Sequence, residues 1–177
     1  MVFLNMLVLL LGLGVAHGCC PGAKNVALQG KATQSSILQG PVGFMGIAMN
    51  AIDGNHESNY HKGSCTHTTQ DLAPWWRVDL LKPHKVAKVI ITNRGDCCPE
   101  RLAGAEIRIG NSLENYGNNN PRCATISSAT IGEVFNCGDM EGRYVNVVIP
   151  DRNEYLTLCE VEVIGVPACD DNCLTVL

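Results

Sequence analysis

The chain has 177 residues, a length that suits one domain and hardly two. Its net charge of −4 and the lack of a basic cluster argue against a nucleic acid or an anionic membrane as partner. No Asn-x-Ser/Thr sequon occurs, so N-glycosylation is not expected.

The N-terminal segment predicts export. Residues 1–18 contain no Lys, Arg, Asp or Glu, Leu7 to Val15 is a short apolar run, and Ala16 and Gly18 are small residues where a signal peptidase reads the chain. The run is shorter than the roughly 18–20 apolar residues that cross a membrane. We therefore predict a signal peptide over 1–18, a single secreted, extracellular domain over 19–177, and no membrane insertion.

All ten cysteines follow the predicted signal peptide, and export makes disulfides a better prediction than zinc or redox sites. Cys19, Cys20, Cys169 and Cys173 lie outside the strand-rich core of about 25–163. Because chain termini often lie close together, we expect these four to bond with one another, either stapling the two ends or joining subunits.

Short alternating or β-branched stretches predict strands, and no long amphipathic helical pattern occurs. Trp75-Trp76 opens such a stretch, which makes core packing a better prediction for the pair than stacking on a sugar. Further strands are predicted over 88–92, 106–109, 144–149 and 158–163. These elements predict an all-β sandwich with long loops.

The segment Asn50-Ala51-Ile52-Asp53-Gly54-Asn55, followed by Ser64, has oxygen-bearing side chains at close spacing. Calcium takes six to eight oxygen ligands, so this segment is one candidate cation loop, although it lacks the EF-hand spacing. An Asx-rich turn explains the same residues without a metal.

A second candidate site combines His67 with a loop that contains Arg94, Arg101 and the adjacent Cys97-Cys98. Arginine offers five donors in a fixed geometry, suited to vicinal hydroxyls or a carboxylate. Ordinary surface arginines, with each cysteine paired elsewhere, are the alternative.

Arg94-Gly95-Asp96 also spells the integrin tripeptide. Because the cysteine pair follows at once, we expect Asp96 to turn inward and orient Arg94 or Arg101. No Gly-x-Ser-x-Gly elbow, phosphate loop or His-Glu-x-x-His motif occurs, and nothing marks Glu160 or Glu162 as a proton donor. The sequence therefore predicts a binding protein and no enzyme.

The spacing of these residues resembles that of the fucolectins, or F-type lectins. Their motif is His, twenty-six residues, Arg-x-Asp, four residues, then Arg or Lys, and here His67, Arg94, Asp96 and Arg101 match it. Trp-Trp-Arg-Val-Asp-Leu and Leu-Cys-Glu-Val-Glu-Val extend the likeness over about 25–163. The resemblance implies a jelly-roll β-sandwich similar to discoidin-like and galactose-binding domains, with several disulfides.

The resemblance also implies roles. His67, Arg94 and Arg101 would hydrogen-bond α-L-fucose, supported by Asp96, Cys97 and Cys98. An apolar shelf for the fucose methyl would come from Leu38, Val42, Tyr60 and His61. The family's Ca²⁺ ligands map to Asn50, Asp53, Asn55, Ser64, Cys159 (through its carbonyl) and Glu160, and its disulfides to Cys65–Cys159, Cys97–Cys98 and Cys123–Cys137.

By resemblance, the protein is expected to be a secreted calcium-containing lectin for terminal α-L-fucose. It would bind fucosylated glycans, recognise microbial surface sugars in innate immunity and form a homo-oligomer, with a trimer as the expected number. The alternative function is a discoidin-like adhesion module without fucose specificity.

Overall fold

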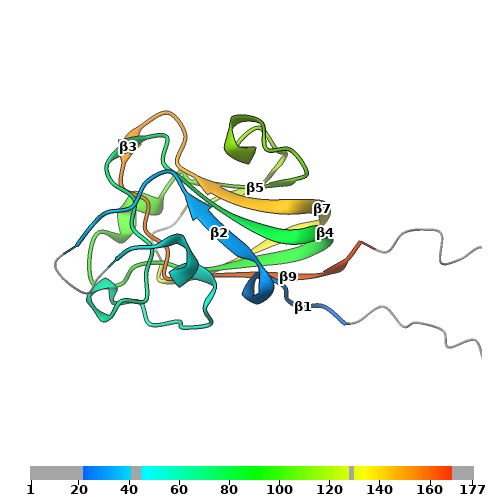
Figure 1. Cartoon of the computed structure of the whole chain (residues 1–177), viewed down its shortest axis with the longest axis horizontal. Coiled ribbons are helices and arrows are strands. Elements are labelled where there is room, and N and C mark those ends of the chain that lie inside the picture. Colours follow the sequence, from blue (N-terminus) through cyan, green and yellow to red (C-terminus); the bar gives the residue numbers. More distant parts are fainter. Residues whose placement is uncertain (1–21, 41–44, 128–129, 169–177) are drawn as a thin grey trace, which may run out of the picture.

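The computed structural model describes residues 22–40, 45–127 and 130–168 (Figure 1). The predicted signal peptide over 1–18, Val42 and the terminal cysteines Cys19, Cys20, Cys169 and Cys173 lie outside these ranges. Among the described residues, no helix has the length and apolar character needed to cross a membrane.

The described residues form nine β-strands and five short 3-10 helices, with no α-helix. The strands are β1 (Lys24–Asn25), β2 (Lys31–Gln34), β3 (Asp71–Leu72), β4 (Trp75–Thr92), β5 (Glu106–Gly110), β6 (Arg122–Thr125), β7 (Gly132–Val148), β8 (Asn153–Glu154) and β9 (Glu160–Pro167). The 3-10 helices are η1 (Ala27–Gln29), η2 (Ala48–Ile52), η3 (Tyr60–Lys62), η4 (Pro99–Leu102) and η5 (Glu114–Gly117). The all-β prediction is confirmed.

Seven strands form one antiparallel sheet in the order β1-β9-β4-β7-β5-β6, with β2 also paired to β4, and β3 pairs with β8 separately. The register of β4 against β7 shifts between Asp79 and His84. Before this shift β4 pairs with β2 and with the end of β7, and after it β4 pairs with β9 and with the first part of β7. The two long strands thus connect the two parts of the sandwich, and the loops of residues 45–70 lie at the left end in Figure 1.

Alternate residues of the strands build one core between the two parts. Trp76, Val78, Val89 and Val161 are fully buried in the same cluster, as a period of two residues requires. The Trp76 indole N–H also donates to the carbonyl of Ala48 at 2.9 Å. Core packing is therefore confirmed for this tryptophan, whereas its half-buried neighbour Trp75 lies outside the core cluster.

The predicted strand over 158–163 begins later than expected, at Glu160. The reason is tertiary, because the carbonyl of Leu158 accepts the backbone N–H of Thr66 at 2.7 Å instead of joining the main sheet. This departure from the sheet positions the candidate site.

Candidate functional site

The segment that carries His67 is held against the chain just before β9. The Thr68 N–H donates to the carbonyl of Leu156 at 3.0 Å, and the Cys65–Cys159 disulfide ties the two segments together. The same pairing brings Tyr155 to His67, with ring centroids 5.5 Å apart in an edge-to-face arrangement.

The environment of His67 fixes its hydrogen-bonding role. Its side chain is buried and Nδ1 lies 2.7 Å from the carbonyl oxygen of Thr68. A carbonyl only accepts, so Nδ1 carries the proton and Nε2 keeps a lone pair. Burial lowers the pKa of His67, and the charges of Arg94 and Arg101 lower it further, against the opposing effect of the Thr68 hydrogen bond. The imidazole is therefore neutral at physiological pH.

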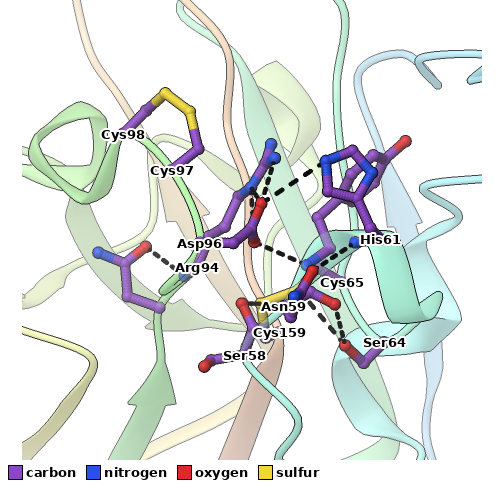
Figure 2. A network of polar contacts seen from close by, with 12 residues as sticks. Ser58, Asn59, His61, Ser64, Cys65, Arg94, Asp96, Cys97, Cys98 and Cys159 are labelled. Atoms are coloured by element: carbon purple, nitrogen blue, oxygen red, sulfur yellow. Dashed lines mark hydrogen bonds and ion pairs between the residues drawn. A yellow bond between two sulfur atoms is a disulfide. The ribbon is translucent and has the colours of Figure 1, made fainter.

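Arg94 follows β4 and is only 7% exposed. Its Nη2 lies 2.7 Å from Oδ2 of Asp96, and its Nε donates to the same carboxylate (Figure 2). These hydrogen bonds, with one from the Tyr60 backbone N–H, lower the pKa of Asp96 to about 2. Asp96 thus turns inward and orients Arg94, so it is not presented at a free loop tip as integrin binding requires.

Arg101 is carried by the short helix η4, which starts after Cys98. Cys98 adopts a left-handed backbone conformation with φ of 54°. The Arg101 guanidinium lies 4.8 Å from the ring centroid of Tyr155, and its Nε is 3.6 Å from Oε1 of Glu154. Its side chain remains 26% exposed, which leaves donors open to a ligand.

The three predicted residues meet in one cluster. The ring of Tyr60 lies 5.1 Å from that of His67, and the Arg94 guanidinium lies 4.7 Å from the Tyr60 ring centroid. Tyr60 and Tyr155 therefore flank His67, with one arginine over each tyrosine. The cluster presents arginine donors beside an imidazole acceptor, a set that can hydrogen-bond adjacent hydroxyls.

Sequence reasoning missed Tyr155, whose only local signal is an aromatic residue a few positions before Cys159. Of the residues assigned to the shelf, Tyr60 is 6% exposed and acts as a wall beside His67. Leu38 is half-buried, and its N–H donates to the His67 carbonyl at 2.8 Å. His61 is largely exposed, with Nε2 3.9 Å from Oδ2 of Asp96.

All three disulfides implied by the resemblance are present: Cys65–Cys159, Cys97–Cys98 and Cys123–Cys137. Figure 2 shows the Cys97–Cys98 bond on the chain just beyond Asp96 and Arg94. It therefore lies in the loop that connects the two arginines of the cluster.

Glu160, one of the implied calcium ligands, is fully buried, and neither carboxylate oxygen has a hydrogen-bond partner. Burial raises the pKa of Glu160 to about 7, and the negative charge of Asp53 raises it further. A buried carboxylate that has no hydrogen-bond partner and lies near a second carboxylate fits the surroundings of a metal ion.

Of the other implied side-chain ligands, Asn50 lies in η2, and Asp53, Asn55 and Ser64 lie in the chain that follows it. Asn50 donates from its side chain to the Cys65 carbonyl at 3.1 Å, Asp53 Oδ1 accepts from the Asn55 N–H at 2.8 Å, and Ser64 Oγ contacts the carbonyl of Glu57. The described part of the chain contains no group of three or more His, Cys, Asp or Glu that could hold a metal. The implied set has only two carboxylates, with amide, hydroxyl and carbonyl oxygens that suit calcium rather than zinc.

Known proteins resemble this chain in sequence and in fold. A family model described as NedA-like, galactose-binding domain matches residues 50–147. Fucolectin-4 of Anguilla japonica is 59% identical over 143 residues, which cover 79% of this chain and 79% of the relative. The chain belongs to the fucolectin family. Because fucolectins are lectins, the prediction that the chain is no enzyme is confirmed.

Solved structures agree with the fucolectin assignment. The crystal structure of a fucolectin from Morone saxatilis serum has a TM-score of 0.77 at 54% identity, covering 83% of this chain and 50% of that one. A fucose binding module from Streptococcus pneumoniae has a TM-score of 0.68 at 31% identity, covering 80% and 95%. The predicted discoidin-like, galactose-binding-like fold is confirmed.

Proposed function

We propose that this fucolectin binds terminal α-L-fucose on glycans through His67, Arg94 and Arg101. The observation that carries the proposal is the convergence of these three side chains, distant in sequence, around two tyrosines. We propose fucose as the ligand because similar proteins are named fucolectins and a fucose binding module.

The cluster recognises hydroxyls by complementary hydrogen bonds. Each arginine donates to sugar oxygens, while Nε2 of His67 accepts from a hydroxyl. A hydroxyl placed between them donates and accepts at once, so its two bonds strengthen each other. Hydrogen bonds to charged groups contribute roughly 1.5–3 kcal/mol each.

Asp96 and the Cys97–Cys98 disulfide support this arrangement. Asp96 holds the Arg94 guanidinium in one orientation, which reduces the entropy lost when a sugar binds. The disulfide packs against the sugar ring in this proposal. Burial of the fucose methyl adds roughly 0.8 kcal/mol, whereas an extra hydroxyl at that position, as in L-galactose, costs about 1–3 kcal/mol without a partner.

Calcium is also part of the proposal, as a structural ion. The ligands would be the side chains of Asn50, Asp53, Asn55, Ser64 and Glu160, with the carbonyl of Cys159. The unpartnered buried carboxylate of Glu160 supports a cation at this place. The bound ion would neutralise the two carboxylates and order the loop that leads to His67 without contacting the sugar.

The finer biological role completes the proposal. The protein is exported and acts outside the cell, recognising microbial surface glycans in innate immunity. It assembles as a homo-oligomer, for which a trimer is the expected number. A single shallow site binds modestly because ordering and desolvation consume much of the gain, so several sites on one particle supply avidity.

The test is the Arg101→Ala variant, measured by calorimetry with L-fucose. Arg101 is partly exposed, so its loss should reduce affinity by at least about tenfold, as expected for one lost charged hydrogen bond, with little change in melting temperature. Arg122→Ala is the matched control, because Arg122 is a more exposed arginine on β6, outside the cluster. This variant should bind L-fucose normally.

Unchanged fucose affinity in Arg101→Ala would refute the site assignment. Binding to a glycan array that free L-fucose does not compete would instead support an adhesion module of the same fold.

A further inference from the structure

A pocket lies outside the fucose cluster. Its volume is about 250 Å³, and it lies between the start of β4, strand β5 and the β5–β6 loop. Neither His67 nor either arginine of the cluster lines it. In Figure 1 the β5–β6 loop lies at the top of the view, away from the loops of residues 45–70 at the lower left.

A stacked aromatic pair forms one wall of this pocket. Trp75 and Tyr116 have ring centroids 5.1 Å apart with an interplanar angle of 16°, and both line the pocket. Tyr116 is 60% exposed, so part of its ring faces solvent. Pyranose rings present C–H groups that pack on such aromatic faces, while their hydroxyls need polar partners at the rim.

Backbone strain concentrates around the same pocket. Among the described residues, seven non-glycine residues have positive φ, and four of them line it: Ala73, Asn115, Tyr116 and Asp151. Such conformations persist only where the surroundings enforce them, and they cluster at functional sites.

Hydrogen bonds from Arg77 and Asn146 hold the backbone conformation of Tyr116. Its carbonyl accepts from Nη1 of Arg77 at 2.6 Å and from Nδ2 of the fully buried Asn146 at 3.0 Å. The next residue, Gly117, has φ of 91°, and a Cβ there would come within 2.8 Å of the Asn146 amide oxygen. The aromatic wall is therefore held in place before any ligand arrives.

The charges at the polar rim cancel, because the two arginines that surround Glu106 are offset by Glu106 and by the carboxylate of Asp151, which also lines the pocket. Glu106 is 8% exposed and accepts from Arg108 at 2.8 Å and from Arg122 at 2.6 Å. Asn115 and Asn118 add amide groups to the lining. Because the rim offers donors and acceptors with its buried carboxylate already neutralised, it suits an uncharged polyhydroxyl ligand better than an ion.

We propose that this pocket is a second saccharide site, which takes a neutral pyranose on the Tyr116 face. This site is separate from the proposed fucose site, and the segment of residues 151–155 runs from one to the other. Asp151 lines the pocket, Arg152 donates to the carbonyl of Ala103 at 2.9 Å, and Tyr155 belongs to the fucose cluster.

The experiment is nuclear magnetic resonance titration of the full protein with L-fucose present in excess. The probes are methyl β-D-galactopyranoside, methyl α-D-mannopyranoside and N-acetylglucosamine, added one at a time. At least one of them should shift the indole N–H signal of Trp75 and the backbone signals of Asn115 and Tyr116. The indole of Trp76, hydrogen-bonded in the core, is the internal reference and should not move.

Two variants test the assignment. Tyr116→Ala should weaken the responding sugar by roughly three- to tenfold, as expected for one lost aromatic contact, and leave fucose binding unchanged. Asn115→Gly keeps the left-handed backbone while removing the amide, and should also weaken it. Leu113→Ala, at another exposed position of the same loop, is the matched control.

The Arg101→Ala variant separates the two proposals, because it should lose fucose affinity and keep the Trp75 response. Absence of any shift at Trp75 with all three probes overturns the second site. A shift that Tyr116→Ala leaves at full strength overturns it as well.

Discussion

At the scale of single residues, the surroundings of His67 convert an ambiguous side chain into a defined acceptor. Thr68 fixes the proton on Nδ1, and two arginines oppose a second proton. A neutral imidazole can therefore serve as an acceptor for a sugar hydroxyl beside the cationic donors. The same logic explains Asp96, whose lowered pKa keeps it ionised as the partner of Arg94 at all physiological pH values.

The state of His67 predicts how fucose binding depends on pH. Its pKa lies below the ordinary value of 6.5, so affinity should stay constant above pH 6.5 and fall as acidification protonates Nε2. Calorimetry with L-fucose from pH 8 to lower pH, alongside the imidazole resonance, measures both events. Affinity that remains constant while the His67 resonance titrates contradicts the acceptor role.

At the scale of elements, close contact between loops positions the cluster. The backbone N–H of His67 donates to the carbonyl of Gly46 at 3.0 Å, and a Cβ on Gly46 would lie 2.5 Å from the same His67 nitrogen. Only glycine fits this approach, which places the loop before η2 against the strand-like segment of His67.

Gly46→Ala should therefore displace His67 and reduce fucose affinity by about tenfold or more, since small misplacements of a polar group cost much of its interaction. The matched control is Gly132→Ala, where no atom lies within 4 Å of the added Cβ. Calorimetry with L-fucose compares the two variants. Equal affinities in both variants would mean that the loop does not position the imidazole.

At the scale of the whole molecule, calcium bound to the loops is expected to increase the stability of the folded protein. An ion that binds only the folded state stabilises it by about 2.7 kcal/mol when present at a hundred times its dissociation constant. Calcium should thus raise the melting temperature of the EDTA-treated protein in a concentration-dependent way, which scanning calorimetry measures.

Glu160→Gln should remove this calcium-dependent rise. The control, Glu162→Gln, changes a more exposed carboxylate on the same strand and should keep it. A melting temperature that is the same in EDTA and in calcium removes the ion from the proposed function.

The sequence by itself determined the class of fold. Alternation at Trp76 and Val78, and again at Val161 and Val163, is a local pattern with a period of two, and the core of the sandwich follows it. Residues 158–161 depart from the pattern, because all four are buried. The spacing from His67 to Arg101 is also readable from one chain, because it is a property of residue order. What residue order does not contain is the start of β9 at Glu160, which pairing with the His67 segment delays.

Only the tertiary structure decided which groups meet. Tyr155 packs against His67, and Asp96 accepts hydrogen bonds from Arg94 rather than from Arg101. The carboxylate of Glu160 is buried without a hydrogen-bond partner. Each depends on contacts between segments that are remote in the chain, where no local period operates. The physical reason is that hydrogen bonding and desolvation are set by the neighbours in space, and the packed loops bring those neighbours together.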